Sequence, residues 1–137
     1  MTLTDRLKLR ARQRAVNYFR ARLTMIKVEP EQGLFNLRCF DNAVDYVRRF
    51  PATEVVEVIF VYNGEPILHY INRNSVGTYL ETTLGYQAAT LEYYLLRTIH
   101  AEDHKWLAGE FDRANRSWSR EFTTWWQRWF FGLDKIL

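Results

Sequence analysis

The stretch EVVEVIFVYNGEPILHYIN, Glu54 to Asn72, says more about the fold than any other part of the sequence. Its first nine residues are mostly β-branched or aromatic, which is typical of a strand. Asn63 and Gly64 come next, and this dipeptide favours a two-residue turn between antiparallel strands. The segment PILHYIN then has the composition of a returning strand. The stretch therefore predicts a β-hairpin.

Further strands are expected after this hairpin. The segment TYLETTL, residues 78–84, follows the turn RNSVG and has the composition of a third strand. The segment LEYYLLRTI, Leu91 to Ile99, fits either a fourth strand or a helix, and we favour the strand. The sequence thus predicts an antiparallel sheet of three to four strands.

Helices are expected on both sides of these strands. Residues 3–27 lack Gly and Pro and are rich in Arg, Leu and Ala, which predicts a basic helix that the segment EPEQG, Glu29 to Gly33, breaks. A second helix is expected from Cys39 to Arg49, because the residue before Pro51 avoids helical geometry. Glu102 to Phe131 predicts one or two aromatic-rich helices. The predicted class is α+β, with these helices packed on the sheet.

Composition indicates one domain, residues 1–137, with 47% hydrophobic residues for a core. The single cysteine cannot form an internal disulfide, which favours a reducing compartment and predicts a cytoplasmic protein. No apolar run reaches the roughly 18 residues that span a bilayer. The charge is uneven: residues 1–28 carry eight Lys and Arg against Asp5 alone, whereas the other 109 residues carry eleven cations and fifteen anions.

Cys39 has two interpretations. Free cysteine is usually a small buried hydrophobe. A cysteine at the start of a helix, however, lies at unpaired backbone N–H groups and the positive end of the helix dipole, which favour thiolate over thiol. The same amides can stabilise an oxyanion. Cys39 is therefore a candidate nucleophile if a base and an orienting acid lie nearby.

His69 and Glu81 are the candidates for those two roles. His69 lies between apolar residues of a predicted strand, where its ring needs a partner. If the second and third strands pair about Ser75, opposed residue numbers sum to 150, and His69 faces Glu81 directly. Asn72 is a competing third member, since some thiol hydrolases use Asn. Alternation directs it to the opposite face from His69, so Glu81 is preferred.

Two segments resemble a known family. CFDNA, Cys39 to Ala43, resembles the Cys-x-Asp-x-Ala helix start of transglutaminase-like proteins, and HYINRNSVGTYLETT, His69 to Thr83, resembles their His strand and acid-x-Thr strand, with Glu where Asp is usual. The order of Cys, His and acid also resembles papain-like folds. The resemblance implies Cys39 as nucleophile, His69 as base and Glu81 as orienting acid. Gln32 resembles the oxyanion glutamine of papain-like enzymes, at a spacing one residue longer.

The resemblance covers Cys39 to Thr83, about a third of the chain, and the size of the whole chain resembles small bacteriophage-type proteins. It implies a small cysteine-dependent amide or acyl hydrolase or transferase that acts on a protein or peptide substrate. No cofactor is expected. No metal is expected either, because His100 and His104 are a helical pair without a third placed ligand.

The alternative hypothesis is a non-catalytic binding protein, such as a phage-type inhibitor of a host factor. Its contacts would come from the basic helix and from an aromatic C-terminus that also suits self-association. Residues 1–28 would bind nucleic acid in a third hypothesis. The candidate partner-binding residues are Arg6, Lys8, Arg10, Arg12, Arg14, Trp125, Trp126 and Trp129.

Overall fold

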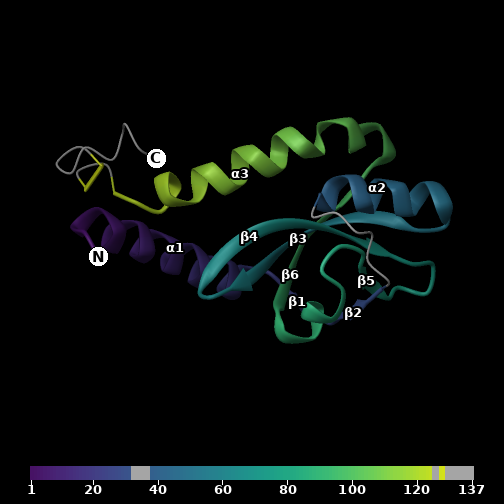
Figure 1. Cartoon of the computed structure of the whole chain (residues 1–137), viewed down its shortest axis with the longest axis horizontal. Coiled ribbons are helices and arrows are strands. Elements are labelled where there is room, and N and C mark those ends of the chain that lie inside the picture. The colour runs from purple at the N-terminus through teal and green to yellow at the C-terminus, as the bar shows by residue number, and fades with distance from the viewer. Residues whose placement is uncertain (32–37, 125–126, 129–137) are drawn as a thin grey trace.

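In the computed structural model the chain has an α+β fold built on a six-stranded mixed sheet (Figure 1). The structure describes residues 1–31, 38–124 and 127–128, without the side chains of 115–119. The elements are α1 (Leu3–Arg22), β1 (Met25–Ile26), β2 (Val28–Pro30), α2 (Cys39–Arg49), β3 (Glu54–Tyr62), β4 (Glu65–Arg73), β5 (Tyr79–Glu81), the 3-10 helix η1 (Gly85–Thr90), β6 (Glu92–Ile99), the 3-10 helix η2 (Ala101–Trp106) and α3 (Leu107–Glu121).

The predicted hairpin forms the middle of the sheet. β3 pairs with β4 along its whole length, with Tyr62 opposite Glu65. Asn63 and Gly64 have φ values of 50° and 76°, the left-handed conformation that a two-residue turn between twisted strands requires. The hairpin prediction is therefore confirmed, as is the strand interpretation of Leu91 to Ile99, since β6 pairs with the other edge of β3.

The sheet curls into a nearly closed barrel. Its strand order is β1-β6-β3-β4-β5-β2, so the two outer strands are consecutive in the chain and only Lys27 separates them. β2 runs parallel to β5, and the other pairs are antiparallel. The prediction of an antiparallel sheet of three to four strands was wrong in number and in this one direction. β1 and β2 have two and three residues, too few to show strand alternation in a sequence.

Residues Val55 to Val61 of β3 are all buried, because each face of the sheet has its own core. One face packs against α1, α2 and α3, which we call the helical core; it includes Ala15, Phe19, Cys39, Ala43, Val55, Ile59, Tyr70 and Leu107. The other face lines the inside of the curled sheet, which we call the inner core; it includes Val28, Val56, Val58, Phe60, Ile71, Ala88 and Tyr93.

The bounds of α2 agree with the prediction, α3 ends at Glu121 although helix was expected as far as Phe131, and α1 differs at its end. This helix begins after Thr2, which forms a capping box with Asp5, and it ends at Arg22 rather than near residue 27. It stops early because Met25–Ile26 pairs with β6 instead. α2 has the predicted bounds. α3 lies alongside α1, as Figure 1 shows, so both helices cover the same face of the sheet.

Candidate active site

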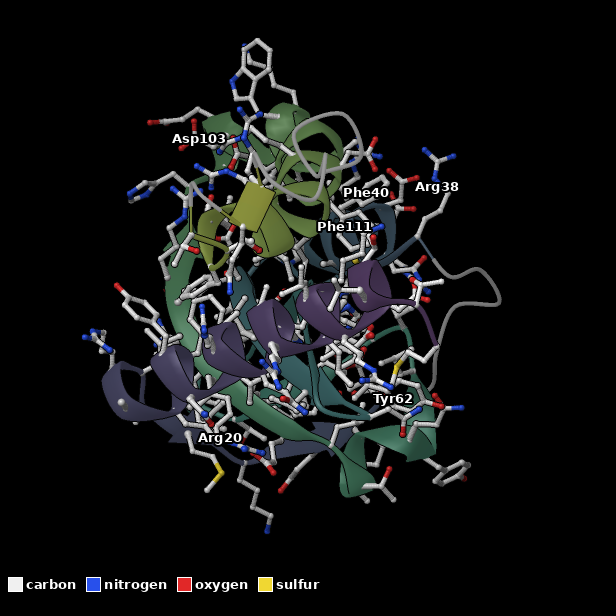
Figure 2. All side chains as sticks on the ribbon, turned by 90° about the vertical axis from the view of Figure 1, so that its left-hand side faces the viewer. Arg20, Arg38, Phe40, Tyr62, Asp103 and Phe111 are labelled. Carbon is white, nitrogen blue, oxygen red and sulfur yellow. The ribbon has the colours of Figure 1, made fainter. Side chains whose placement is uncertain are left out.

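Cys39 is the first residue of α2. The preceding residue, Arg38, is the N-cap but makes no side-chain cap bond, and the first-turn amides of a helix have no partner within the helix itself. The thiol is enclosed in the helical core, with Cys39 only 2% exposed. Its neighbour Phe40 stacks at a tilt on Phe111 of α3, with 5.9 Å between ring centroids (Figure 2). A substrate can therefore reach the sulfur only when side chains around it move.

His69 projects from β4 on the inner-core side, opposite Val58 of β3. Its ring meets the Phe60 ring edge to face, with centroids 5.1 Å apart. The Cys39 side chain lies within interaction range of both the His69 ring and the Tyr70 side chain, although these two point to opposite faces of β4. The thiol therefore lies beside β4 where both side chains come within its reach. The β4–β5 ladder consists of two pairs, at Asn72 and Arg73, so it ends before His69.

Glu81 contacts His69, although not by the predicted register. The observed pairs, Asn72 with Leu80 and Arg73 with Tyr79, sum to 152, whereas the prediction was 150. This shift moves the partner of any residue by two positions, which preserves the face of the sheet and makes Glu81 a diagonal neighbour of His69. Both carboxylate oxygens lie within 3.0 Å of His69 Nε2. The predicted pairing register was wrong, but the contact that it implied is present.

Glu81 is fixed by several donors besides His69. The backbone N–H groups of Thr83 and Leu84 donate to Oε1 at 2.9 and 3.1 Å, and the Tyr93 hydroxyl donates to Oε2 at 2.7 Å. Tyr93 belongs to β6, which β3 and β4 separate from β5 in the sheet, so its bond to Glu81 crosses the inner core. No local pattern in the sequence indicates this contact, because it depends on the curl of the sheet.

The His69 and Glu81 side chains form a buried ion pair. Burial disfavours the imidazolium, but the Glu81 charge and hydrogen bonds to Cys39 and Glu81 outweigh it and raise the pKa of His69 to about 10. Burial also opposes the carboxylate, yet His69 and the donors from Tyr93 and Thr83 lower the pKa of Glu81. An imidazolium donates from both nitrogens. Since Nε2 faces Glu81, Nδ1 is the nitrogen left for the sulfur of Cys39.

The two other candidates for this site lie elsewhere. Asn72 points to the face opposite His69, as alternation predicted, and its amide donates to the carbonyls of Ala43 and Glu54 at 2.9 and 3.3 Å. Its oxygen accepts from the Thr82 hydroxyl at 3.0 Å. Asn72 therefore joins α2 to the sheet instead of orienting His69. Gln32 lies outside the described residues.

Several cations of α1 contact the protein itself. Arg12 forms an ion pair with Glu65, and Arg20 pairs with Glu92 at 3.0 Å. Arg14 donates to the carbonyl of Phe122 at 3.4 Å. Of the cations predicted to bind a partner, Arg6, Lys8 and Arg10 are not part of these contacts, and the partner-binding prediction stays a prediction. Trp125, Trp126 and Trp129 lie outside the described residues.

Comparisons with protein families, with characterised proteins and with solved structures found no match to this chain. In the part of the chain that the structure describes, no helix is long and apolar enough to cross a membrane. The same residues hold no group of three or more His, Cys, Asp or Glu that would bind a metal ion. The functional argument therefore rests on the geometry around Cys39.

Proposed function

We propose that this protein is a cysteine-dependent amide or acyl hydrolase or transferase. Cys39 is the nucleophile, His69 transfers protons, and Glu81 orients the imidazole and stabilises its protonated form. One observation carries the proposal: a buried histidine is bound through Nε2 by a carboxylate and also interacts with the only thiol of the chain. These three groups would suit the roles of nucleophile, base and orienting acid in covalent catalysis.

The reaction proceeds in two balanced stages. The thiolate of Cys39 attacks the carbonyl carbon of an amide or ester, a C–S bond forms, and the negative charge moves to the carbonyl oxygen. The C–N or C–O bond then breaks, and the His69 imidazolium gives its Nδ1 proton to the leaving amine or alcohol. In the second stage water or an amine attacks the thioester, His69 takes its proton, and Cys39 leaves as thiolate.

The oxyanion of each intermediate needs donors close to the sulfur. The first turn of α2 supplies backbone N–H groups without intrahelical acceptors, at the residue that carries the thiol. The positive end of the helix dipole adds to their effect. No further side chain has to be invoked for this role. Peptide, isopeptide and glutamine amides all present the carbonyl that this chemistry attacks.

Alkylation by iodoacetamide tests the proposal, because Cys39 is the only thiol in the chain. We expect the folded protein to be labelled near neutral pH much faster than it unfolds, as measured by mass spectrometry beside hydrogen exchange. His69→Ala should slow the labelling by at least about tenfold, since the imidazolium stabilises the thiolate. His100→Ala is the matched control, because His100 is exposed and far along the chain from the site, and it should leave the rate unchanged.

A specific observation favours the second candidate function, a non-catalytic binding protein. Cys39 is almost completely buried, as a structural cysteine would be. In that case the thiol reacts only when the whole protein unfolds, and His69→Ala accelerates labelling by destabilising the fold. This outcome would replace the enzyme proposal by a binding function, such as that of a phage-type inhibitor of a host factor.

A further inference from the structure

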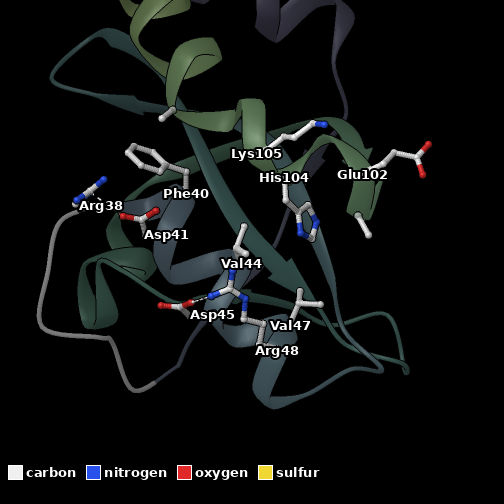
Figure 3. A pocket seen from close by; sticks show the side chains of 12 residues that line it. Arg38, Phe40, Asp41, Val44, Asp45, Val47, Arg48, Glu102, His104 and Lys105 are labelled. Carbon is white, nitrogen blue, oxygen red and sulfur yellow. Dashed lines mark hydrogen bonds and ion pairs between the residues drawn. The ribbon is translucent and has the colours of Figure 1, made fainter.

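Asn42 lies on the buried face of α2, one turn after Cys39. Residues three apart share a face of a helix, and the buried residues of α2 are Cys39, Asn42 and Ala43. The opposite face of α2, with Val44 and Arg48, lines a groove of about 810 Å³ (Figure 3). Neither Cys39 nor Asn42 is among the described residues of this groove, so both side chains face the sheet.

An asparagine in this position needs an explanation. Asn42 is 0% exposed, and an amide buried in a protein core costs free energy unless it is hydrogen-bonded. Asparagine also forms helices less readily than alanine or leucine, which would fill the same position without a polar group. Neither helix formation nor apolar packing therefore accounts for Asn42, and its hydrogen bonds are the feature to consider.

The Asn42 amide binds the segment that follows Glu81. Its Nδ2 donates to the Thr83 hydroxyl at 3.0 Å, and the backbone N–H of Thr83 donates to Glu81 Oε1 at 2.9 Å. Thr83 thus connects the helix that carries the thiol with the carboxylate that binds His69. Because Cys39 also interacts with His69, these contacts form a closed ring that includes the thiol, the imidazole and the acid.

This link occurs where the pairing of β5 with β4 has ended. Leu80 is the last residue of β5 that pairs with β4, so Glu81 lies one residue beyond that ladder. On its other side Glu81 pairs with Pro30 of β2, which fixes it within the sheet but not relative to α2. Apolar contacts are non-directional, whereas a hydrogen bond restricts both distance and angle. The bond from Asn42 to Thr83 therefore sets the position of α2 relative to the acid.

We propose that Asn42 and Thr83 are positioning residues that hold the Cys39 thiol in line with its base. Both act through other groups: Asn42 fixes the first turn of α2, and Thr83 fixes the carboxylate of Glu81. This inference rests on the proposed function, since it assigns the residues that align the nucleophile of that centre. A misplacement of about 1 Å can slow a reaction by about 100-fold, so alignment of this kind has a measurable effect.

The neighbouring residue, Thr82, provides a matched control. It is also buried, and its hydroxyl donates to the side-chain oxygen of Asn72 at 3.0 Å. Without that hydroxyl, Asn72 still has its bond to the carbonyl of Ala43 in α2. Thr82→Val and Thr83→Val therefore each remove one buried hydroxyl that bonds to an asparagine. Only Thr83→Val breaks the direct bond between α2 and the segment after Glu81.

Two measurements on the full chain test the proposal: the rate of Cys39 alkylation by iodoacetamide and the NMR signals of the His69 ring nitrogens. We expect Thr83→Val to slow alkylation at least about threefold and to shift the His69 signals. Thr82→Val should leave both unchanged, although it loses a comparable hydrogen bond. Thr83→Ser keeps the hydroxyl and should restore both. A general loss of stability would not produce this selectivity.

Equal effects of the two valine variants, or no recovery in Thr83→Ser, overturn the proposal. If Thr83→Val does not fold, Asn42→Ala breaks the same bond by removing the amide itself. A shift of the His69 signals in that variant supports the proposal, and unchanged signals overturn it. If Cys39 of the folded, unaltered protein is not alkylated, the enzyme proposal alone fails, because the His69 signals report the alignment without any reaction at the thiol.

Discussion

Two glutamates are buried in the sheet, one on each face, and each has a phenol and a base as partners. Glu57 of β3 lies on the helical-core face, where it accepts from the Tyr70 hydroxyl at 3.0 Å and pairs with Arg97 at 3.1 Å. Glu81 lies on the inner-core face, where it accepts from the Tyr93 hydroxyl and pairs with His69. In both cases a tyrosine hydroxyl and a basic side chain therefore stabilise the buried carboxylate.

The two bases differ in what they can do. Arg97 keeps its charge at all physiological pH values, and its side chain is 57% exposed, so this pair is a structural link at the rim. His69 is a titratable group with a side chain only 4% exposed, and the thiol of Cys39 lies beside it. The comparison shows that the chemistry of a buried carboxylate depends on its partner: a histidine makes proton transfer available where an arginine does not.

The largest expected difference between the two sites is in stability. Glu81→Ala leaves His69, Tyr93 and two backbone N–H groups without their acceptor in the buried core, and should lower the free energy of unfolding by about 3–5 kcal/mol. Glu57→Ala leaves the Tyr70 hydroxyl unpaired, while exposed Arg97 turns to water, so about 1–3 kcal/mol is expected. Urea unfolding at pH 7 measures both. Equal losses would show that burial alone, and not the titratable partner, sets the energy.

The dependence of stability on pH should also separate the two sites. The folded pKa of His69, about 10, lies above its ordinary value of 6.5, so its contribution is complete below pH 6.5 and is lost as pH rises through about 10. The pKa of Glu81 is below its ordinary value of 4.5, so its contribution is complete above pH 4.5 and is lost at lower pH. The stabilising effect of the pair is therefore greatest between these two ordinary values.

The measurement is urea unfolding of the protein and of a His69→Gln, Glu81→Gln double variant at about pH 3.5, 5.5 and 9.5. The difference in free energy between the two proteins should be largest at the middle pH and smaller at both others. Arg97→Gln, which removes the permanent cation of Glu57, provides the control and should show no decline at about pH 9.5. A difference that stays constant with pH would mean that His69 and Glu81 do not form an ion pair.

Local signals made one part of this arrangement predictable. Asn63-Gly64 and the strand alternation fixed the hairpin, and with it the face on which His69 lies. Because side chains alternate along a strand, Glu81 was expected on the same face as His69, and a register shift of two residues leaves that face unchanged. That shift arises in the turn between β4 and β5, where the backbone N–H of Asn74 donates to the carbonyl of Thr78 and Gly77 has a φ of 87°. Several turns of similar length fit the sequence RNSVG, so the register was beyond prediction.

The support for Glu81 from outside its own hairpin could not be predicted in the same way. Tyr93 reaches Glu81 only because the sheet curls, and the outer strands of that sheet, β1 and β2, are too short to have a pattern. The meeting of Cys39 with His69 likewise depends on how α2 packs against β4. No periodicity in the sequence indicated that contact, and the family resemblance that suggested it stays a prediction.

The smallest expected difference between the two sites is in the role of the tyrosines that donate to the glutamates, Tyr93 to Glu81 and Tyr70 to Glu57. Tyr93→Phe and Tyr70→Phe each remove one hydroxyl that donates to a buried carboxylate, so each should cost about 1.5–3 kcal/mol of stability. Burial and the neighbouring carboxylate raise the pKa of both phenols, so both remain protonated donors at neutral pH. In stability the two variants should therefore look alike.

They should differ in the reactivity of Cys39. Tyr93 helps to fix Glu81, which in turn fixes the His69 ring, so Tyr93→Phe should slow alkylation of Cys39 severalfold. Tyr70 lies near the same thiol but supports Glu57, a carboxylate that does not contact His69, so Tyr70→Phe should leave the rate unchanged once stability is matched by temperature. If both variants change the rate to the same extent, thiol reactivity follows the general stability of the fold. A selective effect of Tyr93→Phe would instead show that the reactivity of the Cys39 thiol depends on Glu81, which acts through His69. Such a dependence distinguishes a catalytic histidine–carboxylate pair from a structural one.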